Sequence, residues 1–97
     1  MQANHKLTAV LRGRRITAAG VDGDVLTLRF NDGSAMTVRI TGSSNNVATG
    51  GTVSGVQQAG TTLRLLLESG APVDIPTAEE TSSVMVRGGG GAMEYAD

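Results

Sequence analysis

Basic side chains gathered near the start of the chain have the clearest potential for chemistry. A cluster of this kind can neutralise the phosphates of a nucleic acid. Residues 1–40 contain six Lys and Arg against three Asp, whereas residues 41–97 contain two Arg against six Asp and Glu. One hypothesis is therefore a nucleic-acid-binding surface formed by Lys6, Arg12, Arg14 and Arg15, with Arg29 and Arg39 on a neighbouring sheet face.

Two properties of the composition argue against nucleic-acid binding. Phe30 and Tyr95 are the only aromatic residues, so the chain lacks the stacking platforms that usually hold single strands on small β-domains. The net charge of the whole chain is −1. A positive first part and a negative second part also fit head-to-tail pairing between two copies of the chain.

Residue types that catalyse reactions or hold metals are few and scattered. His5 is the only histidine and there is no cysteine, which excludes multi-histidine and thiolate metal sites within one chain. Asp22 and Asp24 flank a turn glycine, and Glu79 and Glu80 resemble the acidic first turn of a short helix. The sequence therefore predicts no catalytic residue, no metal and no cofactor.

The elements that must position these residues come from an internal repeat. A shift of 37 residues superimposes apolar residues and glycines without a gap. The matched pairs are Ile16 with Val53, Gly23 with Gly60, Leu26 with Leu63, Leu28 with Leu65, Phe30 with Leu67, Gly33 with Gly70, Met36 with Val73, and Val38 with Ile75. We expect one domain over residues 1–97 that contains two similar units, 14–40 and 51–77.

Each unit has the pattern of a three-strand meander. In the first unit, strands are predicted at about 14–21, 25–30 and 36–40, because apolar and polar residues alternate there. Asp32-Gly33 between the last two is a strong hairpin signal, since glycine accepts a positive φ. In the second unit, Pro72 and Pro76 predict a short or edge return strand, and Leu66 points outward among polar residues.

The remaining segments are simpler. Residues 41–49 are rich in Ser, Asn and Gly and predict a loop between the units. Residues 77–81 predict a single helical turn, and residues 83–95 predict a C-terminal hairpin with strands at 83–87 and 92–95. Residues 7–11 fit either a short strand or a helical turn.

Short antiparallel strands with frequent turns predict an all-β fold, a small antiparallel barrel of the SH3-like or a similar type. The first hairpin contains Gly23, Asp24, Leu26, Thr27, Leu28, Phe30, Asp32, Gly33 and Ser34, and the chain closes on Met93-Glu94-Tyr95-Ala96-Asp97. In these residues it resembles short bacterial proteins built on SH3-like or Sm-like barrels. The resemblance implies the barrel and no activity. The paired RNA-contact motifs of Sm proteins are absent from both units, so RNA binding is not carried over.

Three hypotheses about function remain. The first is a non-enzymatic structural or interaction module that forms a homo-oligomer. It would associate through sheet edges, such as the terminal strand with Tyr95, or through an outer face that includes Leu66 and Met85. The second is the nucleic-acid-binding barrel described above. The third is an oligomeric enzyme with its site at a central pore, which follows from fold analogy alone. No signal peptide or membrane span is visible, so we expect a cytoplasmic protein without a membrane partner.

Overall fold

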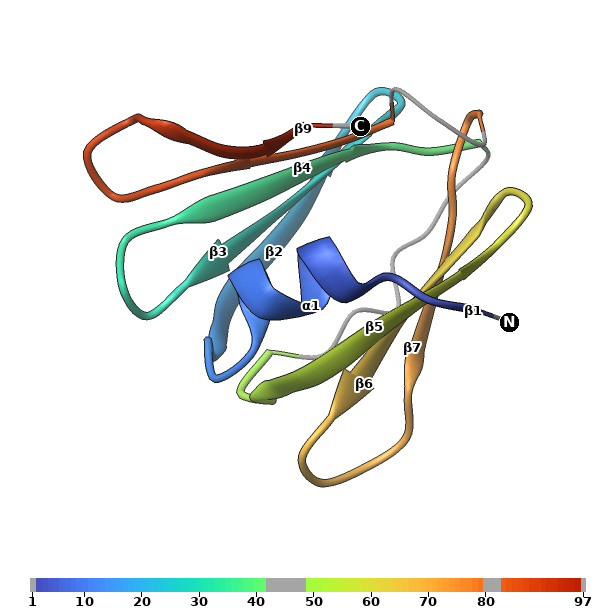
Figure 1. Cartoon of the computed structure of the whole chain (residues 1–97). Helices are drawn as coiled ribbons and strands as arrows, with labels where there is room; N and C mark the ends of the chain where they lie inside the picture. Colours follow the sequence, from blue (N-terminus) through green and yellow to red (C-terminus); the bar gives the residue numbers. More distant parts are fainter. Residues whose placement is uncertain (1, 42–48, 80–82, 97) are drawn as a thin grey trace.

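The computed structural model describes residues 2–41, 49–79 and 83–96. This part of the chain forms an all-β fold with one short helix, in which the strands make two antiparallel sheets (Figure 1). The elements are β1 (Gln2–Ala3), α1 (His5–Leu11), β2 (Ile16–Asp22), β3 (Val25–Phe30), β4 (Ala35–Arg39), β5 (Val53–Ala59), β6 (Thr62–Leu67), β7 (Val73–Pro76), β8 (Val84–Arg87) and β9 (Met93–Ala96). The predicted all-β class is therefore confirmed.

The two sheets contain one meander each. The first has the strand order β2-β3-β4-β8-β9, and the second has the order β1-β5-β6-β7. Every residue pair that joins β2 to β3 recurs between β5 and β6 with a shift of 37 residues, from Ile16 opposite Phe30 to Val53 opposite Leu67. Even the bulge near the start of β2 recurs at the start of β5. The two meanders therefore use the same hydrogen-bonding scheme.

Two isolated bridges join the sheets, and each links a residue to the one 37 positions later. Arg15 pairs with Thr52, and Ile40 pairs with Thr77. At the first bridge the N–H of Ile16 donates to the Gly51 carbonyl, and the N–H of Val53 donates to the Arg14 carbonyl, both at 2.9 Å. Contacts in which equivalent residues meet each other are those of two units around an approximate twofold axis.

The core lies between the sheets, and α1 covers its open side (Figure 1). Alternate residues of β3, β4 and β6 point inward and are fully buried, as the alternation predicts for Leu26, Leu28, Met36, Val38, Leu63 and Leu65. The helix begins after Asn4, whose side chain accepts a hydrogen bond from the Leu7 N–H at 3.0 Å. Leu7 and Leu11, one turn apart, are both fully buried beneath the helix. The helical alternative for residues 7–11 is the one adopted.

Residues 77–79 differ from the prediction, because they form a bridge and a bend instead of a helical turn. The reason is the contact with the other meander. Thr77 is bridged to Ile40, and the Ala78 N–H donates to the Arg39 carbonyl at 2.8 Å, which holds the chain extended. The rest of that predicted turn, residues 80 and 81, lies outside the described residues, as does most of the predicted loop 41–49.

The C-terminal hairpin adds β8 and β9 to the edge of the first meander, with β8 against β4. Its strands begin one residue later than predicted, at Val84 and Met93. The short strand β1 was not anticipated. No helix in the described ranges is long and apolar enough to cross a membrane.

Candidate interaction surface

Arg14, one of the four predicted nucleic-acid contacts, is engaged inside the molecule. Its guanidinium donates to Ser34 Oγ at 2.9 Å and forms ion pairs with Asp32 at 3.3 Å and Glu94 at 2.7 Å. Only 16% of the side chain is exposed. The arrangement ties the segment before β2 to the β3–β4 turn and to β9, so this charge is already compensated.

The other three predicted contacts are exposed, and they come from different segments of the chain. Lys6 lies on α1, Arg12 caps the end of that helix, and Arg15 lies at the bridge to Thr52. They follow the chain around the junction between the sheets. Arg29 and Arg39, by contrast, are both exposed on the outer face of the first meander, on β3 and β4.

The three residues predicted for self-association lie on different parts of the molecule. Tyr95 is half-buried against the core, and its hydroxyl lies 3.0 Å from the Asn4 side-chain nitrogen that donates to it. Leu66 is half-buried opposite Gly55 on the outer face of the second sheet. Met85 is half-buried on the outer face of the first sheet, opposite Thr37. No single patch contains all three.

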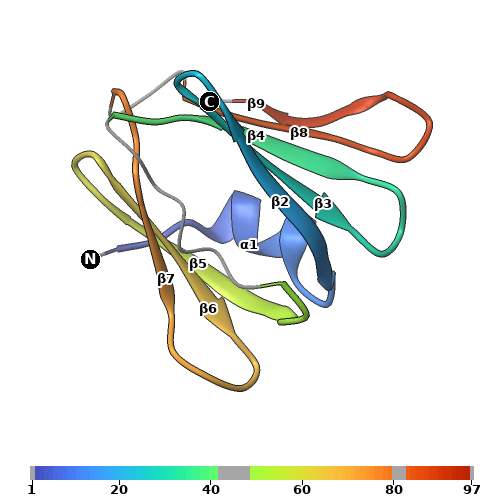
Figure 2. The same cartoon turned by 180° about the vertical axis from the view of Figure 1, so that it is seen from behind.

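Four strands lie at sheet edges in the described part of the chain, and β2 is the longest of them (Figure 2). β1 has two residues, β7 has four and ends on Pro76, and β9 has four. Short edge strands and prolines limit pairing with other chains. β2 has seven residues with no proline or lysine, and every residue after Ile16 is exposed. It is the least protected of these four edges.

In the second unit, the strand edge equivalent to that of β2 is covered. β5 is the counterpart of β2, and its outer edge is occupied by β1 and α1. The Val56 carbonyl accepts from the Asn4 N–H at 2.9 Å, and the Val56 N–H donates to Thr8 Oγ1 at 2.9 Å. Ala19 has the same place in β2, so its N–H and C=O also point away from the neighbouring strand. No strand lies on that side of β2 in the described ranges.

Side chains on the two edges differ accordingly. Val56 is 1% exposed, whereas its counterpart Ala19 is exposed, and Val21 on the same strand is 43% exposed. Sequence reasoning did not single out this edge. The available signal was the comparison between the units, because Ala19 and Gly20 are smaller than their counterparts Val56 and Gln57.

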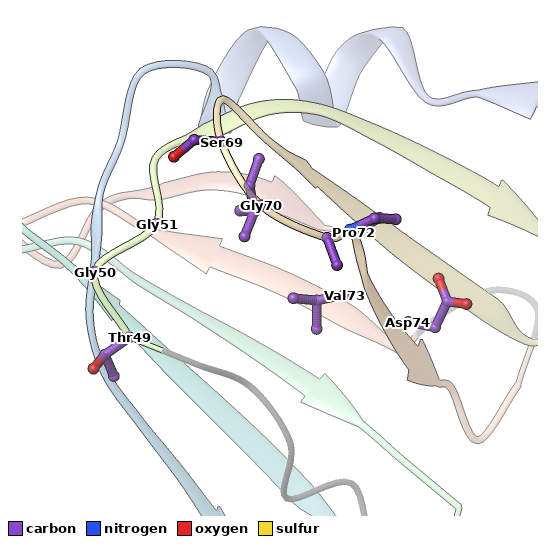
Figure 3. Close-up of a pocket in the computed structure, with 10 residues that line it drawn as sticks. Thr49, Gly50, Gly51, Ser69, Gly70, Pro72, Val73 and Asp74 are labelled. Atoms are coloured by element: carbon purple, nitrogen blue, oxygen red, sulfur yellow. The ribbon is translucent and has the colours of Figure 1, made fainter.

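The largest cavity described lies elsewhere, between the segment 49–51 and the turn after β6 (Figure 3). It has a volume of about 620 Å³ and is lined mainly by glycine, alanine, proline and aliphatic side chains. The one charged group among its described lining residues, Asp74, forms a bidentate pair with Arg64, with distances of 2.7 and 3.0 Å. The hydrogen bonds from Arg64 hold the pKa of Asp74 below its ordinary value. A carboxylate so paired is a poor general base.

Charged groups elsewhere in the described ranges form no metal-binding cluster of His, Asp or Glu. Comparison of the chain with known protein families, curated proteins and solved structures finds no match. Because no related protein indicates a site, we infer the candidate site from the geometry of this chain alone. It consists of the open edge of β2 together with the outer face of the sheet that β2 begins.

Proposed function

We propose that the protein is a non-enzymatic interaction module that self-associates by antiparallel pairing of β2 with β2 of a second copy. The observation that carries the proposal is the exposed edge of β2, whose counterpart β5 is covered by β1 and α1. An edge strand with unpaired N–H and C=O groups is a template for another strand. Pairing two such edges about a twofold axis would join two five-stranded sheets into one.

The ends of β2 carry opposite charges, which favours a second copy as the occupant. The exposed Arg15 precedes the strand, and Asp22 and Asp24 lie at its other end. In an antiparallel pair centred on Ala19, the basic start of each strand lies beside the acidic end of the other. Opposite charges across an interface favour the encounter and fix the register. The small side chains in the middle of β2 offer little steric resistance to close approach.

The half-exposed Val21 side chain gives the proposal its sharpest test. Lysine at an edge position opposes strand pairing, because its ammonium would have to be desolvated next to the partner. Val21→Lys should therefore convert a dimer into a monomer. Val21→Thr keeps the branched shape and β-propensity at the same position and should remain dimeric. Both masses are measured by light scattering on a size-exclusion column, at low and high salt.

Each outcome of that experiment has a clear meaning. A wild-type dimer that weakens at high salt, is lost in Val21→Lys and is kept in Val21→Thr supports pairing through β2. A wild-type chain that stays monomeric at every concentration contradicts self-association. A Val21→Lys variant that stays dimeric moves the contact to another surface. Circular dichroism of each variant checks that the fold is retained.

We also infer that the two sheets form a small, partly open barrel of the SH3-like kind. The bridges Arg15–Thr52 and Ile40–Thr77 support this inference, since they connect the sheets at two places. In this arrangement β2 lies at the opening of the barrel, where closure of the sheet does not protect it.

A further inference from the structure

Three arginines share the outer face of the first sheet. The register places Arg29 of β3, Ala35 of β4 and Arg87 of β8 in one row across the strands. Arg39 lies on β4, four residues beyond Ala35, and therefore on the same face. All three arginines are exposed. Ala35 lies between Arg29 and Arg87, and Thr27, Thr37 and Met85 form the row between them and Arg39.

Within the described part of the chain, no carboxylate neutralises these arginines through an ion pair. The paired arginines there are Arg14 and Arg64. Among the described residues, the Arg87 guanidinium donates to the Gly91 carbonyl, at 3.3 Å. Asp22 lies in the row of Arg39, two strands away across Val25. Two strand spacings are about 10 Å, which is too far for a direct pair.

The repeat again provides an internal comparison. In the second sheet, the counterparts of Arg29 and Arg39 are Leu66 and Pro76, and the arginine on the outer face, Arg64, is paired with Asp74. The same backbone scheme therefore folds with a neutral outer face. The three arginines are not required by the fold, so their unpaired charge is a property of this one surface.

We propose that this face binds the phosphate backbone of a nucleic acid strand. Arginine donates two parallel hydrogen bonds to a phosphate, and threonine hydroxyls donate to phosphate oxygens as well. Thr27 of β3 and Thr37 of β4 lie opposite each other between the rows of arginines. The face has no aromatic side chain, so the contacts are to phosphate and the binding is independent of base sequence.

Spacing on the sheet suits an extended polyanion. Arg29 and Arg87 are two strands apart, about 10 Å, and Arg39 is displaced from their row by about 13 Å along the strand. Separate phosphates of one strand can therefore meet each guanidinium. The face lies beside the β2 edge but does not include it, so a monomer presents the same three arginines. Binding to a single copy does not depend on self-association.

The test is fluorescence anisotropy with a labelled oligothymidylate of about 20 nucleotides in about 50 mM salt. Three phosphate contacts predict that log K falls with log salt with a slope of about −2 per chain. The double variant Arg29→Gln/Arg87→Gln removes two of them. Each phosphate contact contributes a slope of about −0.7 in log K against log salt, and the contribution is taken as zero at 1 M salt. Losing two contacts should therefore lower the affinity about 60-fold at about 50 mM salt.

A matched control removes the same charge elsewhere. Lys6→Gln/Arg12→Gln lowers the net charge equally but leaves the outer face intact, and it should bind within about threefold of the wild type. Measurements are repeated in Ala19→Pro, which removes an outward N–H from the β2 edge and so separates binding from self-association. Ala19→Pro should keep the salt slope per chain.

Three results would overturn the proposal. The first is a folded wild-type protein that does not bind at low salt. The second is a larger loss in Lys6→Gln/Arg12→Gln than in the sheet-face variant, which would place the contacts on α1. The third is equal competition by polyglutamate, which would make the ligand an acidic polypeptide instead of a phosphate backbone.

Discussion

Arg14 provides a direct test of whether a basic residue near the start of the chain serves the fold or a ligand. Its guanidinium contacts Ser34, Asp32 and Glu94, and most of the side chain is buried. The variant Arg14→Met keeps a long apolar stem and removes all three contacts. Arg15→Met is the matched control, because the adjacent side chain is exposed and forms no ion pair within the described residues.

The expected loss follows from the geometry. The hydrogen bond to the buried Ser34 hydroxyl contributes about 1 kcal/mol. The two ion pairs involve carboxylates that are 46% and 37% exposed, so each is screened and contributes only about 0.5 kcal/mol. Arg14→Met should therefore lower the free energy of unfolding by about 2 kcal/mol. Arg15→Met should change it by less than about 0.5 kcal/mol.

Urea unfolding followed by circular dichroism measures both values, and an unchanged m-value shows that the comparison is valid. A double-mutant cycle with Glu94→Gln then isolates the longest link, from the start of β2 to β9. Equal stability of the two variants would refute the reasoning, because Arg14 would then be as free as its neighbour. In that case its contribution to an anion-binding surface would have to be reconsidered.

Two further predictions concern the same region. Hydrogen bonds from Ser34, and the nearby Arg14, hold the pKa of Asp32 below its ordinary value of 3.8, so the stability it contributes is present above that pH and is lost as the pH falls toward the lower folded pKa. In Asp32→Asn, the free energy of unfolding measured with urea should fall less between about pH 5 and pH 2 than it does in the wild type. An unchanged fall would show that other carboxyl groups cause the pH dependence. A methyl group on Gly89 would lie 3.0 Å from the Asp32 carbonyl oxygen, whereas one on Gly90 meets nothing within 4 Å. Gly89→Ala should therefore lower the melting temperature and Gly90→Ala should leave it level or raise it, and equal shifts would contradict this reading.

The elements with strong local signals were predictable from the sequence. The hairpin around Asp32-Gly33 has a turn glycine with a φ of +85° between two alternating strands, and it forms where expected. The inward residues of β3, β4 and β6 are the buried ones. Such patterns depend on neighbouring residues only, which is why a single sequence contains them.

Features that depend on distant parts of the chain were not predictable. β1 exists because two residues pair with β5, and nothing in Gln2-Ala3 alone indicates a strand. The pairing of Arg14 with Glu94 joins residues far apart in the sequence. The edge of β2 is open because β1 pairs with β5 and not with β2. The similar residue patterns of β2 and β5 do not show which of the two is covered.

The bridges between equivalent residues have a consequence for how the chain can change over time. Each half contributes the same surface to the junction, so the junction constrains both halves alike. Positions away from it differ between the halves, with Leu66 in one half where Arg29 stands in the other. The half whose edge is capped can supply stability, while the half with the open edge and the arginines is free to acquire partners. In the functions proposed above, recognition therefore rests on one half of the chain.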